Sequence, residues 1–231
     1  MWTHPTRTPS TGTANLVPPC LLGGDRPPPG EFALPGEFTP PGEFTPPPTN
    51  SEVFKVAWDA LRFPGMRFEI PETKPTVPGL YPATAALCQG LATAGRSLWI
   101  DQTERSLLHQ WCRYGTAACL VADPGKADFT LVTAPAHMPS LHRLNIGDGT
   151  DPATATTLLI QLHGVEPGRD TLWNLDRRGV FSLESLEEIP PHFWQERREL
   201  QEMLPWGIDI FFIHGDSFFS LPRTVYLSGR A

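Results

Sequence analysis

The residues with the clearest potential for chemistry lie near the C-terminal end of the sequence. Asp209 interrupts an apolar run, and Arg223 and Thr224 follow a second apolar run. A carboxylate among buried neighbours needs a partner, and an arginine at the base of an antiparallel hairpin could supply one. Either the two residues pair and stabilise the hairpin, or the arginine binds a phosphorylated ligand or a partner protein. We therefore take Asp209, Arg223 and Thr224 as candidates for a ligand site or an interface.

Motifs for phosphate binding and nucleophilic catalysis are incomplete elsewhere in the sequence. Gly125-Lys126 lacks the first glycine and the final hydroxyl residue of a phosphate-binding loop. Gly147-Asp148-Gly149 does not continue as a dinucleotide-binding fingerprint. Gly215-Asp216-Ser217 is followed by two phenylalanines, which suits a hairpin tip and not a nucleophile elbow. The sequence therefore predicts no catalytic residue.

The histidines and lysines do not match a metal or cofactor site either. The histidines fall on separate predicted elements without zinc-ligand spacing, and His163 is interpreted as a core imidazole bonded to the backbone. A Schiff base requires a desolvated lysine. Lys55 falls on an amphipathic helix, Lys74 in a proline-spaced loop and Lys126 in a polar turn. We expect no metal site and no covalently bound cofactor.

Composition and charge exclude several classes of protein. The formal net charge is -7 and the lysines do not cluster, so we expect no nucleic-acid partner. The apolar runs are far shorter than the roughly 20 residues that cross a bilayer. The N-terminus lacks a secretory pattern, and four cysteines without a Cys-x-x-Cys pair predict reduced thiols. We therefore expect a cytoplasmic protein without disulfides and without membrane association.

Residues 1–50 differ in composition from the rest of the chain. Almost half of the 27 prolines lie there, and a Gly-Glu-Phe hexapeptide repeat places Phe32, Phe38 and Phe44 at even spacing. Such a segment buries too little apolar surface to offset the cost of ordering its backbone. We expect a disordered or polyproline-like arm, which is either a low-complexity extension or a ligand for an aromatic-lined groove. Residues 51–231 are expected to form a single domain.

Hydrophobic periodicity predicts an α/β domain in which helices cover a mixed sheet. Asp101 and Glu104 resemble a capping box that would start a helix. Glycine at Gly215-Asp216 suits the turn of a hairpin. The predicted helices are 51–62, 82–94, 102–114 and 191–203, and the predicted strands are 67–70, 97–100, 117–122, 128–133, 155–162, 171–175, 208–214 and 217–221.

The C-terminal residues also carry a resemblance to a known family. Pro205-Trp206-Gly207-Ile208-Asp209, a hairpin around Gly215, and Leu221-Pro222-Arg223-Thr224 resemble the C-terminal signature of the PhnH family of carbon-phosphorus lyase subunits. The resemblance covers about residues 52–227, while Ala94–Ser97, Leu175–Val180 and the proline arm depart from the family pattern. Further stretches in family order are Phe63-Pro64-Gly65, Leu98-Trp99-Ile100, Ala127-Asp128-Phe129 and Thr156–Leu162.

The resemblance implies more than the residues show. It implies a three-layer fold similar to pyridoxal-phosphate-dependent transferases but without the cofactor. It also implies a homodimer that joins subunits G, I and J of the carbon-phosphorus lyase complex. This complex forms ribose 1-phosphonate 5-triphosphate from MgATP and a phosphonate, and the PhnH subunit is expected to support that step without catalysing it.

Two alternatives remain open at this point. The chain could be a stand-alone α/β enzyme or binding protein for a phosphorylated ligand, which Arg223 would contact. It could instead be an adaptor that recruits a partner through the proline-rich arm.

Overall fold

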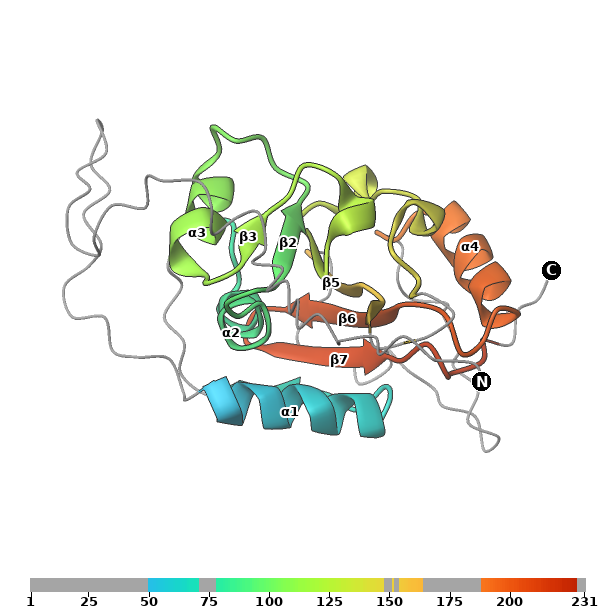
Figure 1. Ribbon diagram of the computed structural model, residues 1–231. Coiled ribbons are helices and arrows are strands. Elements are labelled where there is room, and N and C mark those ends of the chain that lie inside the picture. The colour runs from blue at the N-terminus through green and yellow to red at the C-terminus, as the bar shows by residue number, and fades with distance from the viewer. Residues whose placement is uncertain (1–49, 71–77, 148–150, 152–153, 164–187, 228–231) are drawn as a thin grey trace, which may run out of the picture. The chain divides into compact units, whose positions relative to one another are not determined.

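The computed structural model describes residues 50–70, 78–147, 151, 154–163 and 188–227 (Figure 1). The chain divides into a unit of residues 1–43 and a unit of residues 44–231, and the described residues all belong to the second. The proline-rich arm, Lys74 and the strand predicted at 171–175 lie outside the described residues.

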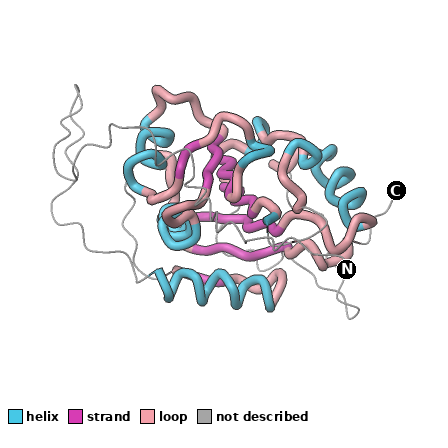
Figure 2. The backbone as a smooth tube through the Cα atoms, viewed as in Figure 1, coloured by secondary structure: helices cyan, strands magenta, loops and turns pink. Residues whose placement is uncertain are grey.

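Figure 2 shows which parts of the backbone are helix and strand. In the described residues these elements follow the predicted order, with shorter bounds at several ends. The α-helices are α1 (Asn50–Arg62), α2 (Pro82–Leu91), α3 (Leu107–Gly115) and α4 (Pro191–Gln201). Short 3-10 helices are η2 (Pro124–Lys126), η3 (Pro135–His137) and η4 (Leu141–Arg143). The strands are β1 (Phe68–Glu69), β2 (Ser97–Ile100), β3 (Cys119–Leu120), β4 (Phe129–Val132), β5 (Thr157–Gln161), β6 (Asp209–His214) and β7 (Ser217–Leu221).

The strands form one seven-stranded mixed sheet within the described residues, in the order β1-β7-β6-β5-β4-β2-β3. Pairing is parallel from β3 through β2, β4 and β5 to β6, and antiparallel from β6 to β7 and from β7 to β1. The central strands β5 and β6 are apolar throughout their interiors because helices cover both faces of a parallel sheet. The predicted α/β class with a mixed sheet is confirmed.

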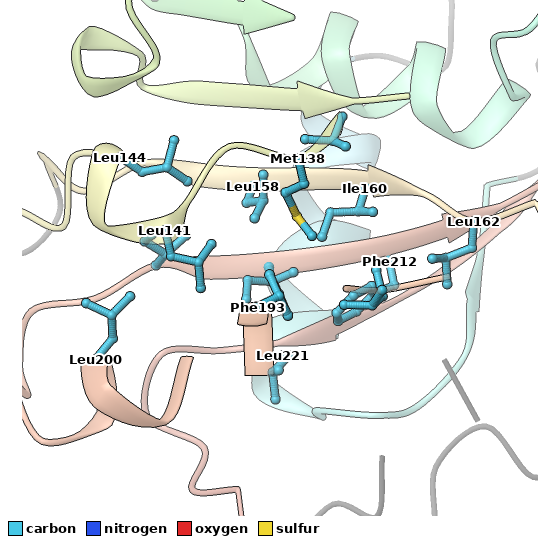
Figure 3. Packing of buried hydrophobic residues seen from close by; sticks show 14 of the residues in the cluster. Met138, Leu141, Leu144, Leu158, Ile160, Leu162, Phe193, Leu200, Phe212 and Leu221 are labelled. Carbon is cyan, nitrogen blue, oxygen red and sulfur yellow. The ribbon is translucent and has the colours of Figure 1, made fainter. Parts of the chain in front are cut away.

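Successive side chains along each strand point to opposite faces of the sheet, and the two faces pack against different helices. Leu158 and Ile160 of β5 belong to a buried cluster with Phe193 and Leu200 of α4 (Figure 3). On the opposite face, the hydroxyl of Ser220 in β7 donates to the carbonyl of Ala60 in α1, at 2.7 Å. Helices α1 and α2 therefore cover one face of the sheet, and α4 covers the other.

Two glycines are important to the fold, one for the packing of two helices and one for a turn. A Cβ on Gly90 of α2 would lie 2.6 Å from Cγ1 of Val53 in α1, so the two helices can approach only because this side chain is absent. Gly215 has a φ of 61°, which glycine adopts without strain. The β6–β7 hairpin forms around this residue, as predicted.

Two expectations are wrong. Helix α3 begins after Ser106, whose side chain accepts a hydrogen bond from the backbone N–H of His109, so Asp101 does not cap it. Instead, the Asp101 carboxylate accepts hydrogen bonds from the backbone N–H groups of Thr133 and Ala134, which follow the neighbouring strand β4. Cys88 and Cys112 are buried free thiols, as expected, whereas Cys119 is disulfide-bonded.

Candidate functional site

The structure brings Asp209 and Arg223 together at the base of the β6–β7 hairpin. Asp209 begins β6, and Arg223 lies just beyond the end of β7. The Arg223 backbone N–H donates to Oδ1 at 2.8 Å, and the guanidinium Nε and Nη2 donate to Oδ2 at 3.1 and 2.6 Å. The side chains of Arg223 and Asp209 are 14% and 18% exposed, so little solvent screens the pair. The predicted ion pair is confirmed.

A second arginine, which the sequence reasoning missed, fixes the segment after β7. Arg197 of α4 is only 1% exposed, and its Nη2 donates to the backbone carbonyls of Pro222, Arg223 and Val225 at 2.9, 3.2 and 3.1 Å. Burial lowers the pKa of this guanidinium to about 10, and the carboxylate of Asp209 partly opposes that decrease. Arg197 therefore stays charged at neutral pH and holds the chain around Arg223 in place.

These contacts favour a structural role for the hairpin base. The Arg223 guanidinium is committed to Asp209, while Thr224 is exposed on the following turn. Stabilisation of the hairpin was one of the two interpretations left open by the sequence, and the hydrogen bonds support it. A role for Asp209, Arg223 and Thr224 in binding a ligand or a partner remains a prediction.

A different polar cluster lies at the carboxyl ends of the parallel strands. In open α/β sheets this edge is where ligands bind. Thr133 follows β4, His163 lies just beyond β5 and His214 ends β6. Tyr81, at the start of α2, joins them: its ring centroid lies 5.6 Å from that of His163 and 5.5 Å from that of His214. We call Tyr81, His163 and His214 the carboxyl-edge cluster.

Backbone carbonyls determine which imidazole nitrogens carry protons in this cluster. Nε2 of His163 lies 2.7 Å from the Thr133 carbonyl oxygen, which can only accept, so this nitrogen is the donor. Nδ1 of neutral His163 is then an acceptor, and the Tyr81 hydroxyl at 3.0 Å donates to it. Nδ1 of His214 donates in the same way to the carbonyl of Leu162 at 2.9 Å, so Nε2 of neutral His214 is an acceptor.

Further hydrogen bonds hold the cluster in position. The Gln161 side chain accepts from the backbone N–H of Tyr81 at 2.9 Å and donates to the carbonyl of Gly79 at 2.9 Å. The carboxylate of Glu188 accepts from the backbone N–H of His163 at 2.8 Å. Burial, and secondarily the negative charge of Glu188, raise the pKa of Tyr81, so its hydroxyl stays protonated at neutral pH.

The carboxyl-edge cluster can therefore bind polar groups through the Tyr81 hydroxyl and the two imidazoles. The predicted bond of His163 to the backbone is confirmed, but the residue is exposed, so its predicted core position is wrong. A signal was present in the sequence, since a polar residue directly follows each apolar run at Ile100-Asp101, Val132-Thr133, Leu162-His163 and Ile213-His214. Parallel pairing places all these run ends at one edge of the sheet.

No group of three or more metal-ligating side chains occurs in the part of the chain that the structure describes. Among the same residues, no helix is both long and apolar enough to span a bilayer.

Comparison with known proteins identifies the family. No curated protein matches the sequence. A family model described as "Bacterial phosphonate metabolism protein (PhnH)" matches residues 41–228. This match covers most of the chain, including the hairpin base and the carboxyl-edge cluster. The chain therefore belongs to the PhnH family of bacterial phosphonate metabolism proteins.

Proposed function

We propose that this chain is the PhnH subunit of the carbon-phosphorus lyase core complex. It would support the formation of ribose 1-phosphonate 5-triphosphate from MgATP and a phosphonate without catalysing that step alone. The observation that carries the proposal is the family match over residues 41–228. The C-terminal signature around Asp209 and Arg223 supports it because the hairpin that these residues stabilise lies within the matched range.

The proposed partners are a second copy of this chain and subunits G, I and J. Large exposed apolar side chains support a role in an assembly, because such residues are common where protein interfaces form. In the described residues, Phe54, Trp58, Phe63 and Met66 are each at least half exposed and lie on α1 or just after it. We place the assembly in the cytoplasm.

The proposal includes no covalently bound cofactor, and MgATP would be a substrate of the complex. Lys55 is exposed on the outer side of α1, and Lys126 is exposed ahead of β4, at the amino end of that strand. A lysine that forms a Schiff base must be desolvated, and neither of these lies at the carboxyl edge. Helices on both faces of a mostly parallel sheet are compatible with the proposed likeness to pyridoxal-phosphate-dependent transferases.

We further propose that the carboxyl-edge cluster is where this subunit contacts a ligand or a reacting partner of the complex. Its two imidazoles and its protonated phenol can donate and accept hydrogen bonds. A stand-alone protein that binds phosphate through Arg223 is less well supported, because that guanidinium already bonds to Asp209. The adaptor alternative depends on the arm, which lies outside the described residues.

Growth on a phosphonate as the sole phosphorus source tests the proposal. A strain that lacks this chain should fail to grow, and the full chain should restore growth. The purified chain with MgATP and phosphonates should show no turnover alone. Growth of the deletion strain at the wild-type rate would contradict the proposed role, whereas turnover by the isolated chain would favour the stand-alone enzyme. Restored growth with a chain that lacks residues 1–50 would exclude the adaptor alternative.

A further inference from the structure

The outer face of α1 presents an aromatic pair to solvent. Phe54 and Trp58 are each 56% exposed, and their rings stack with centroids 6.4 Å apart and an interplanar angle of 12°. Together with Lys55 they line a hollow of about 260 Å³. On the opposite side of the helix, Val53 and Ala57 are buried. Figure 1 shows α1 lying beside α2 and β7. The helix therefore has one packed face and one apolar face that no described residue covers.

Charged residues surround the aromatic pair in a pattern that is complementary to itself. Glu52, Lys55 and Arg62 are exposed, and Asp59 is half-buried. None of the four makes an ion pair within the described part of the chain. Like the aromatic residues, they lie on the outer side of the helix, since three- and four-residue spacings return to the same face.

The two charged pairs share a centre, and the aromatic pair is centred one residue away. The midpoint of Glu52 and Arg62 is position (52 + 62)/2 = 57, and the midpoint of Lys55 and Asp59 is (55 + 59)/2 = 57. For Phe54 and Trp58 the midpoint is (54 + 58)/2 = 56. A second α1 laid antiparallel across position 57 would place each acid beside its base. The aromatic rings of the two copies would also meet, with Phe54 and Trp58 offset by two residues, about 3 Å along the helix axis.

We propose that the outer face of α1 is a two-fold interface between two copies of this chain. The inference rests on the self-association included in the proposed function and adds the surface that performs it. An interface of this symmetry must be self-complementary, with each contact made twice. It would contain two Glu52–Arg62 pairs, two Lys55–Asp59 pairs and a central cluster of four aromatic rings. A different protein would require no such symmetry in this helix, so the charge pattern favours a second copy.

Sedimentation equilibrium of the full chain over a range of concentrations tests the interface. The wild type should be dimeric, and Trp58→Glu should raise the dimer dissociation constant at least about 30-fold, as expected for a central aromatic contact. Leu107→Glu is the matched control, because Leu107 is 51% exposed on α3, outside the proposed interface. This variant should remain dimeric. Circular dichroism would establish that each variant keeps the fold.

A charge exchange tests the register. Lys55→Glu alone should weaken the dimer roughly tenfold, because it replaces the two Lys55–Asp59 pairs of the interface by two pairs of like charge. Adding Asp59→Lys in the same chain should restore the wild-type dissociation constant. Failure of this restoration would overturn the proposed register.

Other outcomes separate this inference from the proposed function. A dimer that Trp58→Glu leaves unchanged would overturn the α1 interface while the proposed self-association stands. A monomeric wild type would overturn both, although the growth assay would still decide the role in phosphonate use. A full chain that is monomeric, with dimers only when residues 1–49 are removed, would show that the arm covers this face and would also overturn the inference.

Discussion

Replacement of Arg197 by methionine tests the idea that a buried guanidinium fixes the segment after β7. The substitution keeps a long side chain but removes the donor to the carbonyls of Pro222, Arg223 and Val225. One buried and two partly buried carbonyls that lose their donor cost about 1–2 kcal/mol each. Removal of the buried charge recovers part of this cost, because burial disfavours the charged guanidinium and lowers its pKa to about 10. We therefore expect Arg197→Met to destabilise the chain by about 2 kcal/mol, within the usual range for the loss of a buried hydrogen-bond donor.

Urea unfolding followed by circular dichroism measures this loss. For a domain of this size, 2 kcal/mol corresponds to a decrease of about 6 °C in Tm. Arg198→Met is the control, since this neighbouring arginine is only half-buried and its replacement should change stability by less than about 0.5 kcal/mol. Because Arg197 stays charged below its lowered pKa, the difference between the two variants should not change between pH 6 and pH 8. Equal stability of Arg197→Met and the wild type would refute the reasoning.

Three further perturbations test the packing and the carboxyl-edge cluster. Asp209→Asn should destabilise the chain by about 2 kcal/mol, because Arg223 would lose its carboxylate partner in a poorly solvated site. Urea unfolding measures the free energy of unfolding, and an unchanged value would contradict the importance of this ion pair. Gly90→Ala should cost about 1–3 kcal/mol through the clash with α1, and an unchanged Tm would count against that close approach. Glu188→Gln should lower the raised pKa of Tyr81, which an ultraviolet titration measures. Because the Tyr81 pKa is higher in the folded than in the unfolded state, wild-type stability should fall as the pH rises above 10. An unchanged titration in Glu188→Gln would exclude the charge of Glu188 as a cause.

The hairpin base could be predicted from the sequence because its signals are local. Asp209 stands out in an apolar run, a glycine turn follows, and antiparallel pairing brings the distal arginine back beside it. The helices and central strands could be predicted for the same reason, since periodicity reports on neighbouring residues. Arg197 could not be recognised because its acceptors are backbone carbonyls, which every residue has, and because three other charged residues lie beside it in the same helix.

The carboxyl-edge cluster depends on contacts between distant parts of the chain. Tyr81 and His163 are 82 residues apart, and His163 and Thr133 are 30 residues apart. Only the order of the parallel strands brings them together, and that order does not follow from the pattern of any single strand. The order of the strands also explains why Asp101 does not cap the helix that follows it. Its carboxylate bonds to backbone N–H groups just after the neighbouring strand β4.

Affinity purification of the full tagged chain from phosphate-starved cells tests the central claim most directly. If the chain functions within the carbon-phosphorus lyase complex, subunits G, I and J should co-purify with it in fixed ratios, and the Leu107→Glu control should retain them. Recovery of this chain alone, under conditions in which those subunits are present in the same cells, would contradict the account.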